Sequence, residues 1–305
     1  MIVNAATLAA FMTGLKTFFN NAFEGAAPFY PKISMKVPSS TREEKYGWLA
    51  QDTGLREWIG PRVVTNLSIF DYTLKNRKFE KTTAVDRDDM EDDRVGVIAP
   101  FISEMGRAAA EHPDTLCGEL LSSGFTAACY DGQPFFDADH PVGDGANIPT
   151  VSVSNVQTGS GAAWFLLDAS RAVKPIIYQE RAPPKFTALN QDSDENVFMH
   201  DEYLYGIRAR YNVGYGLWQL AYASKADLTA ANYEAARAAM MAFKGDGGRP
   251  LGVKPNVLVV PPSLEGAGMR LINNGTRIEV VSDVPVPIQN EWAKTAELIV
   301  TPWLT

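Results

Sequence analysis

Three residues whose side chains could ligate a metal ion occur close together in the sequence, at and just before His140. Asp137, Asp139 and His140 occur in the stretch FFDADHP, and carboxylates with a histidine are the ligands of many metal-dependent hydrolases. A divalent ion needs a fourth group, however, and the other two histidines, His112 and His200, stand alone in the sequence. We therefore predict no metal here, and a metal-dependent hydrolase remains the alternative function.

A dense acidic cluster is the second candidate site. Within AVDRDDMEDDRVG, six carboxylates fall in eight positions: Asp86, Asp88, Asp89, Glu91, Asp92 and Asp93. A helix-loop-helix calcium site requires glycine at position 6 and glutamate at position 12 of its loop. A loop that begins at Asp86 has Glu91 and Val97 there. Because acidic residues are stabilised at the positive end of a helix, we predict that the cluster begins a helix.

No other motif indicates catalysis. GDGGRP (residues 245–250) lacks the Lys-Ser/Thr pair of a phosphate-binding loop and is predicted to be a turn. The sequence contains no Gly-x-Ser-x-Gly elbow and no dinucleotide fingerprint after a strand. Cys117 and Cys129 have no histidine nearby in sequence and are expected to be small buried hydrophobes. We predict no catalytic, cofactor-binding or metal-binding residue, and no enzyme activity.

The overall composition describes a globular chain. Of 305 residues, 46% are hydrophobic and 21% are charged, which excludes a disordered protein. The net charge of −8 argues against a DNA-reading role, since such proteins are usually cationic. Two cysteines indicate a reducing compartment. The N-terminal stretch has neither a basic start nor a membrane-spanning length, so we expect no signal peptide and no membrane span.

Two elements in the first third need a partner surface that the neighbouring sequence does not supply. An amphipathic helix is predicted from apolar residues at helical spacing: Leu8, Met12, Leu15, Phe19 and Phe23. After a boundary near Thr41, alternating residues from Arg62 to Val85, interrupted by KNRK, predict a long two-stranded hairpin. An isolated hairpin is marginally stable, so another domain or another subunit must cover it.

The remaining sequence alternates between helices and strands. Ile98 begins a helical pattern that Pro113 should end or kink and that stops at Gly124. A long surface loop is predicted between Cys129 and Thr158, and antiparallel strands follow up to Tyr222. DLTAANYEAARAAMMAFKGDGG predicts a helix capped by Asp227 or Thr229, NVLVVPP a buried strand, and RIEVVSDVPVP and ELIVTPWL closing strands. The predicted fold class is α+β.

The order of these elements resembles the major head (capsid) subunit of Mu-like tailed phages and prophages. The similarity is carried by collinear stretches that include SSTREEKYGWL, FEKTTAVDRDDMEDDRVGVIAPFISEMGRAAAEHPDTL, GFTAACYDGQPFFDADHPV, GYGLWQLAYASKADLT and FKGDGGRPLGVKPNVLVVP. It extends through nearly the whole chain. The resemblance implies the Hong Kong 97 type of capsid fold.

That fold implies four regions. They would be an N-terminal arm (1–45), an extended hairpin loop region (46–90), a peripheral domain (91–225) and an axial domain with closing strands (226–305). Within the peripheral domain we expect a spine helix at about 95–124 and antiparallel strands at about 163–222. The resemblance also implies self-assembly into an icosahedral shell around double-stranded DNA, in the virion, after assembly in the host bacterial cytoplasm. A ring-forming tail or adaptor protein has similar composition and remains an alternative.

The resemblance further implies partners and contacts. The partners would be other copies in pentamers and hexamers, a scaffold protein, a portal at one vertex, a decoration or minor capsid protein, and DNA held weakly at the inner wall. Some relatives cross-link hairpin lysines, here Lys75, Lys78 and Lys81, but we expect no such bonds. Aromatic residues dominate interface hot spots, although each one here could equally be a core residue. The candidate intersubunit contacts are Leu8, Met12, Leu15, Phe19, Trp48, Trp58, Phe70, Tyr72 and Phe79.

Overall fold

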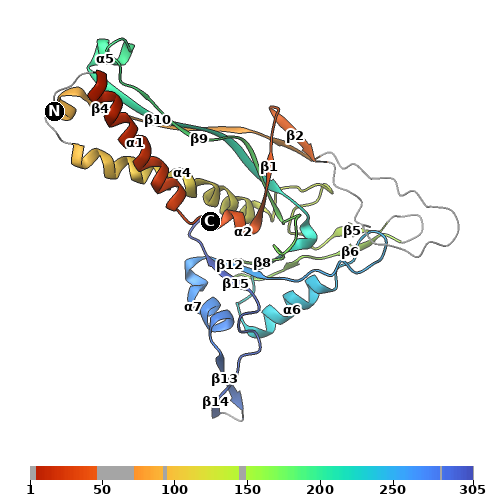
Figure 1. Ribbon diagram of the computed structural model, residues 1–305. Helices are drawn as coiled ribbons and strands as arrows, with labels where there is room; N and C mark the ends of the chain where they lie inside the picture. The colour runs from red at the N-terminus through yellow and green to blue at the C-terminus, as the bar shows by residue number, and fades with distance from the viewer. Residues whose placement is uncertain (1–4, 47–71, 92–94, 144–148, 282–283, 305) are drawn as a thin grey trace.

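The computed structural model describes residues 5–46, 72–91, 95–143, 149–281 and 284–304. The chain is elongated, with two parts that we call the extended half and the compact half (Figure 1). The extended half carries two long helices beneath a sheet of long strands. The compact half is built on a sheet of short strands, from which a hairpin projects.

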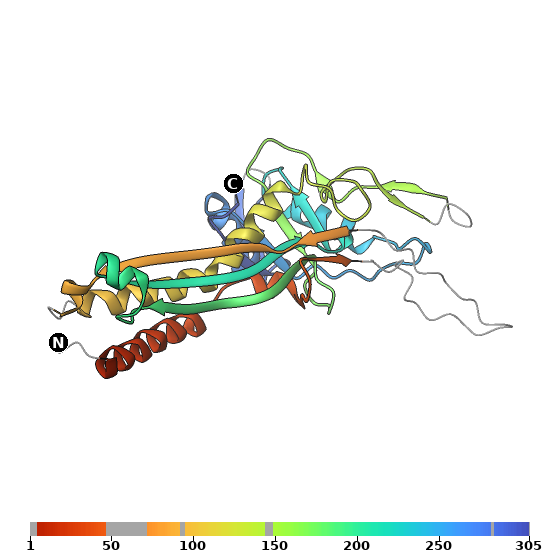
Figure 2. The same ribbon diagram turned by 90° about the horizontal axis from the view of Figure 1, so that it is seen from above.

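A four-stranded sheet forms the extended half. Its strands, in spatial order, are β1 (Ser34–Pro38), β9 (Ile176–Leu189), β10 (Glu202–Tyr215) and β4 (Arg77–Asp86). Every second residue of β10 is buried, from Tyr203 through Tyr211, because alternate side chains of a strand point to one face. That face lies against α4 (Val95–Ser123), while α1 (Ala5–Gly25) packs beside α4 (Figure 2).

The long hairpin predicted at residues 62–85 is wrong in its pairing. The second strand exists as β4, but it pairs antiparallel with β10 along its whole length, from Asp86 opposite Glu202 to Arg77 opposite Tyr211. β3 (Tyr72–Lys75) pairs instead with β2 (Glu43–Tyr46). The alternation in β4 fits a sheet edge as well as a hairpin, and the pattern alone does not name the partner strand. Residues 62–71 lie outside the described residues.

Helix α4 covers the range in which the spine helix was expected, about 95–124. The helix continues through both Pro100 and Pro113 to Ser123, so of the two alternatives expected at Pro113, an end or a kink, the helix does not end there. Figure 2 shows α4 changing direction between its two halves. A short helix α3 (Arg87–Glu91) precedes it, with Asp88 and Asp89 in its first turn, which confirms that the acidic cluster begins a helix.

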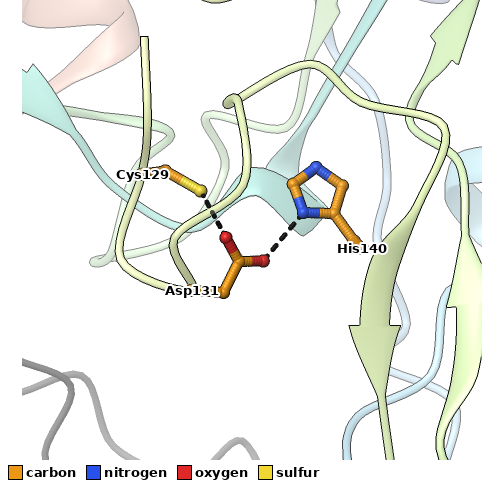
Figure 3. A group of neighbouring side chains, drawn as sticks. All are labelled: Cys129, Asp131 and His140. Carbon is orange, nitrogen blue, oxygen red and sulfur yellow. Dashed lines mark hydrogen bonds and ion pairs between the residues drawn. The ribbon is translucent and has the colours of Figure 1, made fainter.

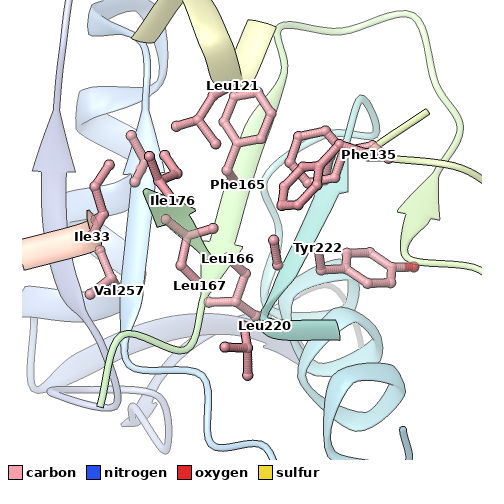
Figure 4. Close-up of a cluster of buried hydrophobic side chains, with 14 of the residues drawn as sticks. Ile33, Leu121, Phe135, Phe165, Leu166, Leu167, Ile176, Leu220, Tyr222 and Val257 are labelled. Atoms are coloured by element: carbon pink, nitrogen blue, oxygen red, sulfur yellow. The ribbon is translucent and has the colours of Figure 1, made fainter. Parts of the chain in front are cut away.

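The compact half contains the larger core. Its five-stranded sheet has the order β15 (Glu297–Val300), β12 (Val257–Val260), β8 (Trp164–Leu167), β11 (Ala221–Ser224) and β7 (Val156–Gln157). All four residues of β8 and of β12 are buried, so the central strands are covered on both faces. Figure 4 shows residues of this cluster, including Phe165, Leu166 and Val257.

The other elements of the compact half largely follow the sequence. Helix α6 (Ala230–Met241) begins where predicted, with the Thr229 side chain accepting a hydrogen bond from the Asn232 amide at 3.2 Å. The hairpin of β13 (Thr276–Val281) and β14 (Val284–Gln289) projects from the end (Figure 1). Residues 245–250 form the predicted turn. No described helix is long and apolar enough to cross a membrane.

The segment 129–158 differs from the predicted surface loop. It contains β5 (His140–Val142) and β6 (Val151–Val153), which pair antiparallel. Phe135, Phe136 and His140 are buried. The glycines and prolines of this segment indicated turns, but they did not show that the turns fold back onto the core.

Candidate functional site

The predicted intersubunit contacts fall into three groups. Trp48, Trp58 and Phe70 lie outside the described residues. Leu8 lies in α1, but its side chain is not among those described. The structure places the remaining five, which are Met12, Leu15, Phe19, Tyr72 and Phe79.

The apolar stripe of α1 is covered within its own chain. Leu15 and Phe19 are almost fully buried in a cluster with Ile102 and Met105 of α4, and Met12 packs against the same cluster. We expected the stripe to need a neighbouring subunit, and α4 supplies that surface instead. Intersubunit contact by these residues stays a prediction.

Tyr72 and Phe79 are likewise held by their own subunit. The Tyr72 hydroxyl accepts a hydrogen bond from the Tyr215 amide at 3.0 Å. The Phe79 ring lies 4.9 Å from the Tyr211 ring and 4.5 Å from His112, centroid to centroid. Both side chains are only partly buried, so part of each remains available to a neighbour. Their intersubunit role stays a prediction.

The structure reveals an exposed apolar patch that sequence reasoning missed. At the far end of the extended half, α5 (Glu195–His200) connects β9 to β10 (Figure 1). Phe198 is 81% exposed, Met199 is 64% exposed and Leu189 is 51% exposed. We call residues 189–202 the tip. The sequence signal of this patch is the apolar run Val197, Phe198 and Met199 in an otherwise polar stretch, which is too short to show helical or strand periodicity.

The tip is also strongly acidic. Residues 189–202 contain five acidic residues and no lysine or arginine. Arg87 supplies a positive charge from the start of α3, where its guanidinium lies 3.6 Å from both Asp192 and Asp201. Exposed charges of this kind contribute little to stability but strongly affect the choice of partner.

The hairpin β13–β14 exposes a further apolar side chain at the opposite end of the molecule. Ile278 is 72% exposed. Near the hairpin base, Arg277 donates two hydrogen bonds to the Glu291 carboxylate, at 2.9 and 3.0 Å. The hairpin therefore exposes the apolar side chain of Ile278, and the ion pair between Arg277 and Glu291 stabilises the hairpin base.

Asp114 joins the N-terminal segment to α4. Its buried carboxylate accepts hydrogen bonds from the backbone amides of Phe29, at 3.0 Å, and Tyr30, at 2.7 Å. It thereby caps the short helix α2 (Tyr30–Ile33) from another element. Burial raises the pKa of Asp114 to about 6, although the two amide hydrogen bonds oppose the shift.

The three residues weighed as metal ligands in the sequence do not come together. The Asp137 carboxylate accepts a hydrogen bond from the Ala138 amide, and the Asp139 carboxylate accepts one from the Ser152 hydroxyl. His140 Nδ1 lies 2.8 Å from Asp131 Oδ2 instead. The turns of this segment direct the three side chains to different partners, so the structure does not bring together the alternative grouping of Asp137, Asp139 and His140.

Asp131 is the centre of a small buried group with His140 and Cys129 (Figure 3). The Cys129 thiol donates to Asp131 Oδ1 at 3.0 Å. Burial raises the pKa of Cys129, and the adjacent Asp131 raises it further. Burial alone would raise the pKa of Asp131, but the hydrogen bonds from His140 and Cys129 outweigh burial and lower it. Both cysteines are free and buried, as predicted.

The other two histidines take no part in this group. His112 Nδ1 lies 2.7 Å from the Tyr211 hydroxyl, and burial lowers the pKa of His112. His200 is exposed in α5. Neither joins a cluster of metal-ligating side chains among the described residues.

Known proteins with similar sequences and folds are phage head proteins. The sequence matches the Mu-like prophage major head subunit gpT over residues 8–304. It is 43% identical to the major capsid protein of Escherichia phage Mu over 309 residues, covering all of both chains.

The fold gives the same result. The protein in the procapsid of bacteriophage JBD30 superimposes with a TM-score of 0.85 at 43% identity, covering 99% of this chain and 100% of that one. The protein in the JBD30 capsid decorated with minor capsid protein trimers gives a TM-score of 0.74 at 30% identity, over 92% and 93% of the two chains. This chain belongs to the family of Mu-like prophage major head subunits.

Proposed function

We propose that many copies of this chain assemble, as pentamers and hexamers, into an icosahedral head that encloses double-stranded DNA. The observation that carries this proposal is the match to procapsid and capsid subunits over essentially the whole length of both chains. A shell subunit must contact several neighbours at once. The elongated shape, with exposed apolar side chains at both ends, suits that requirement.

The tip is the first of the proposed contact surfaces. Phe198 and Met199 would be costly to expose in a subunit that remained alone, and aromatic residues contribute strongly when buried at interfaces. Because the tip is acidic, two identical tips would repel one another if nothing basic lay between them. A basic surface on a neighbouring molecule is the complementary partner.

The N-terminal arm and the hairpin loop are the other proposed contact regions. Since Leu15 and Phe19 are already buried, the exposed face of α1, which includes Phe18, is the surface left for a neighbour. We retain Leu8, Trp48, Trp58 and Phe70 as candidate contacts, and the division into regions 1–45, 46–90, 91–225 and 226–305, as proposals.

The expected partners extend beyond other copies of the chain. One relative forms a capsid decorated with minor capsid protein trimers, and we propose that such a protein binds this shell too. A scaffold protein during assembly and a portal at one vertex are proposed from the family. Assembly would take place in the host bacterial cytoplasm, before the protein becomes part of the virion.

Contact with the packaged DNA should be weak. The chain carries 36 acidic and 28 basic residues. A wall with a large cationic surplus would hold DNA through many phosphates and would oppose its movement. With a net charge of −8, this chain carries no such cationic surplus.

Electron microscopy of the purified protein, alone and co-expressed with a scaffold protein, tests this proposal. Closed shells, or rings of five and six subunits, are expected. A monodisperse monomer under every condition would contradict the proposal, and closed rings of one other size would favour a tail or adaptor role.

A double variant, Phe198→Ser with Met199→Ser, tests the tip. Assembly should fall sharply, while the circular dichroism spectrum of the free subunit stays unchanged. Met241→Ser is the matched control, because Met241 is also more than half exposed but lies on α6 in the compact half. Shells of normal yield from the double variant would refute the role of the tip.

A further inference from the structure

We propose that Cys129, Asp131 and His140 bind one divalent transition-metal ion, for which Zn²⁺ is the best fit. Among the described residues, one potential ligand atom from each of these three side chains lies within 4.8 Å of the other two. A thiolate, a carboxylate and an imidazole are all ligands that zinc accepts. This site differs from the grouping of Asp137, Asp139 and His140 considered from the sequence.

The three side chains already point toward one another, from two separate segments (Figure 3). Cys129 and Asp131 lie in one tight turn, closed by a hydrogen bond from the Cys129 amide to the Gln133 carbonyl at 2.8 Å. Gly132 has φ +87°, a backbone conformation that favours glycine at this turn. His140 begins β5. An ion here would therefore tie the turn to the β5–β6 hairpin.

The ring of His140 is fixed before any ion binds. It stacks on Trp218 with 4.0 Å between ring centroids and 8° between ring planes. Its Nδ1 faces Asp131, whereas its Nε2 is buried without a hydrogen-bond partner among the described atoms. The acceptor Asp131 is therefore what keeps the ring proton on Nδ1 and not on Nε2. A cation that replaced this proton would leave Nδ1 free to act as the ligand.

The distances suit a site that expands slightly when it takes up an ion. His140 Nδ1 lies 2.8 Å from Asp131 Oδ2, and Cys129 Sγ lies 3.0 Å from the other oxygen, Oδ1. Ligands of a tetrahedral zinc ion, with bonds of about 2.0–2.3 Å, lie roughly 3.3–3.7 Å apart. Small side-chain rotations would cover this difference. The ion would take the place of the Cys129 thiol proton and the His140 Nδ1 proton, while the Gln133 amide continues to donate to Asp131 Oδ1, and a water molecule would complete four ligands.

The charges of the group also favour a divalent cation. Asp131 is an almost fully buried carboxylate whose side-chain partners donate from a thiol and an imidazole. When the ion binds, the Cys129 thiol releases its proton to solvent and the proton of His140 moves from Nδ1 to Nε2. One thiolate and one carboxylate then neutralise the two positive charges, so no net charge is buried.

Titration of the purified full-length protein with Co²⁺ tests the site directly. Tetrahedral cobalt with a thiolate ligand gives visible d–d bands and a sulfur-to-metal charge-transfer band. We expect saturation at one equivalent, competition by Zn²⁺, and at least tenfold weaker binding in Cys129→Ser and His140→Gln. Asp137→Asn and Cys117→Ala are the matched controls and should bind as the parent does.

Two outcomes would overturn the proposal. One is a folded parent protein that gives no cobalt spectrum and contains no stoichiometric metal by elemental analysis. The other is equal loss of binding in Asp137→Asn, which would place the ion elsewhere. Because the titration uses free subunits, its result is independent of shell formation and does not depend on the proposed function.

Discussion

The two sheets of the molecule are covered to different extents. In the compact half, β8 and β12 are buried along their whole length and contribute residues such as Phe165 and Leu258 to a large cluster. In the extended half, the separate cluster around Leu15 and Phe19 is much smaller. Large apolar side chains are exposed in both halves, at the tip as well as at Met241 and Ile278, so the contrast between the halves is one of core size. The difference suggests that the compact half is stable by its own packing, whereas the extended half is completed by neighbours.

Three long elements connect the two clusters. Helix α4 contributes Ile102 to the small cluster and Leu121 to the large one. Strands β9 and β10 likewise each contribute residues to both clusters. The extended half is therefore anchored in the compact half at one end only. Its stability should decrease toward the tip, where the fewest buried contacts hold the chain.

The largest expected effect comes from emptying the large core. Phe165 is fully buried and packs on Phe136, with 5.3 Å between ring centroids. Phe165→Ala should lower the free energy of unfolding by about 3–5 kcal/mol, measured by urea denaturation of the free subunit. A loss below about 1 kcal/mol would mean that the compact half does not depend on this packing.

Removing a side chain from the small core should act locally. Leu15→Ala should cost about 2–5 kcal/mol of local stability and should increase hydrogen exchange in α1 and in the neighbouring part of α4. Exchange in β8 and β12 should remain unchanged. If both sheets lost protection together, the two halves would be a single cooperative unit and the comparison would fail.

Acid titration tests the junction at Asp114. The folded-state pKa of about 6 is higher than the value of an unfolded aspartate. The protonated form of Asp114 therefore stabilises the folded state. This contribution is complete below the unfolded pKa and is lost as the pH rises through about 6. Relative to Asp114→Asn, the parent should lose on the order of 1–3 kcal/mol between about pH 4 and pH 7. If the difference in free energy of unfolding between the parent and Asp114→Asn stayed constant or grew with pH, it would contradict this prediction.

The smallest expected effect is at the start of α6. Thr229→Ala removes the side chain that caps the Asn232 amide and should cost about 1 kcal/mol. Thr229→Ser keeps the hydroxyl and should restore most of the loss. Since α6 packs in the compact half, the effect should appear in global unfolding, and an effect confined to exchange at the tip would be unexpected.

Features set by neighbouring residues could be predicted from the sequence, whereas contacts between residues far apart in the chain could not. Local patterns identified α4, α6 with its Thr229 cap, and the buried strand β12, because helical spacing, capping and apolar runs are recorded in neighbouring residues. The partner of β4 was missed, since β10 lies more than a hundred residues further along the chain. Register between such distant strands is not written in either strand alone.

The functional surfaces show the same limit. The amphipathic stripe of α1 was recognised, but its partner, α4 of the same chain, was not. His140 was identified as a candidate ligand, whereas its actual neighbours, Asp131 and Cys129, emerged only when the turn at Gly132 was seen. The tip escaped notice because exposed apolar residues are recognisable only once the buried ones are known.

Hydrogen exchange of the free subunit, compared with the assembled shell, tests most directly whether neighbours complete the extended half. We predict that assembly adds protection at α5 and along α1 in the extended half, while β8 and β12 of the compact half exchange equally slowly in both states. Equal exchange of the tip in both states, or protection gained mainly by β8 and β12, would contradict the account.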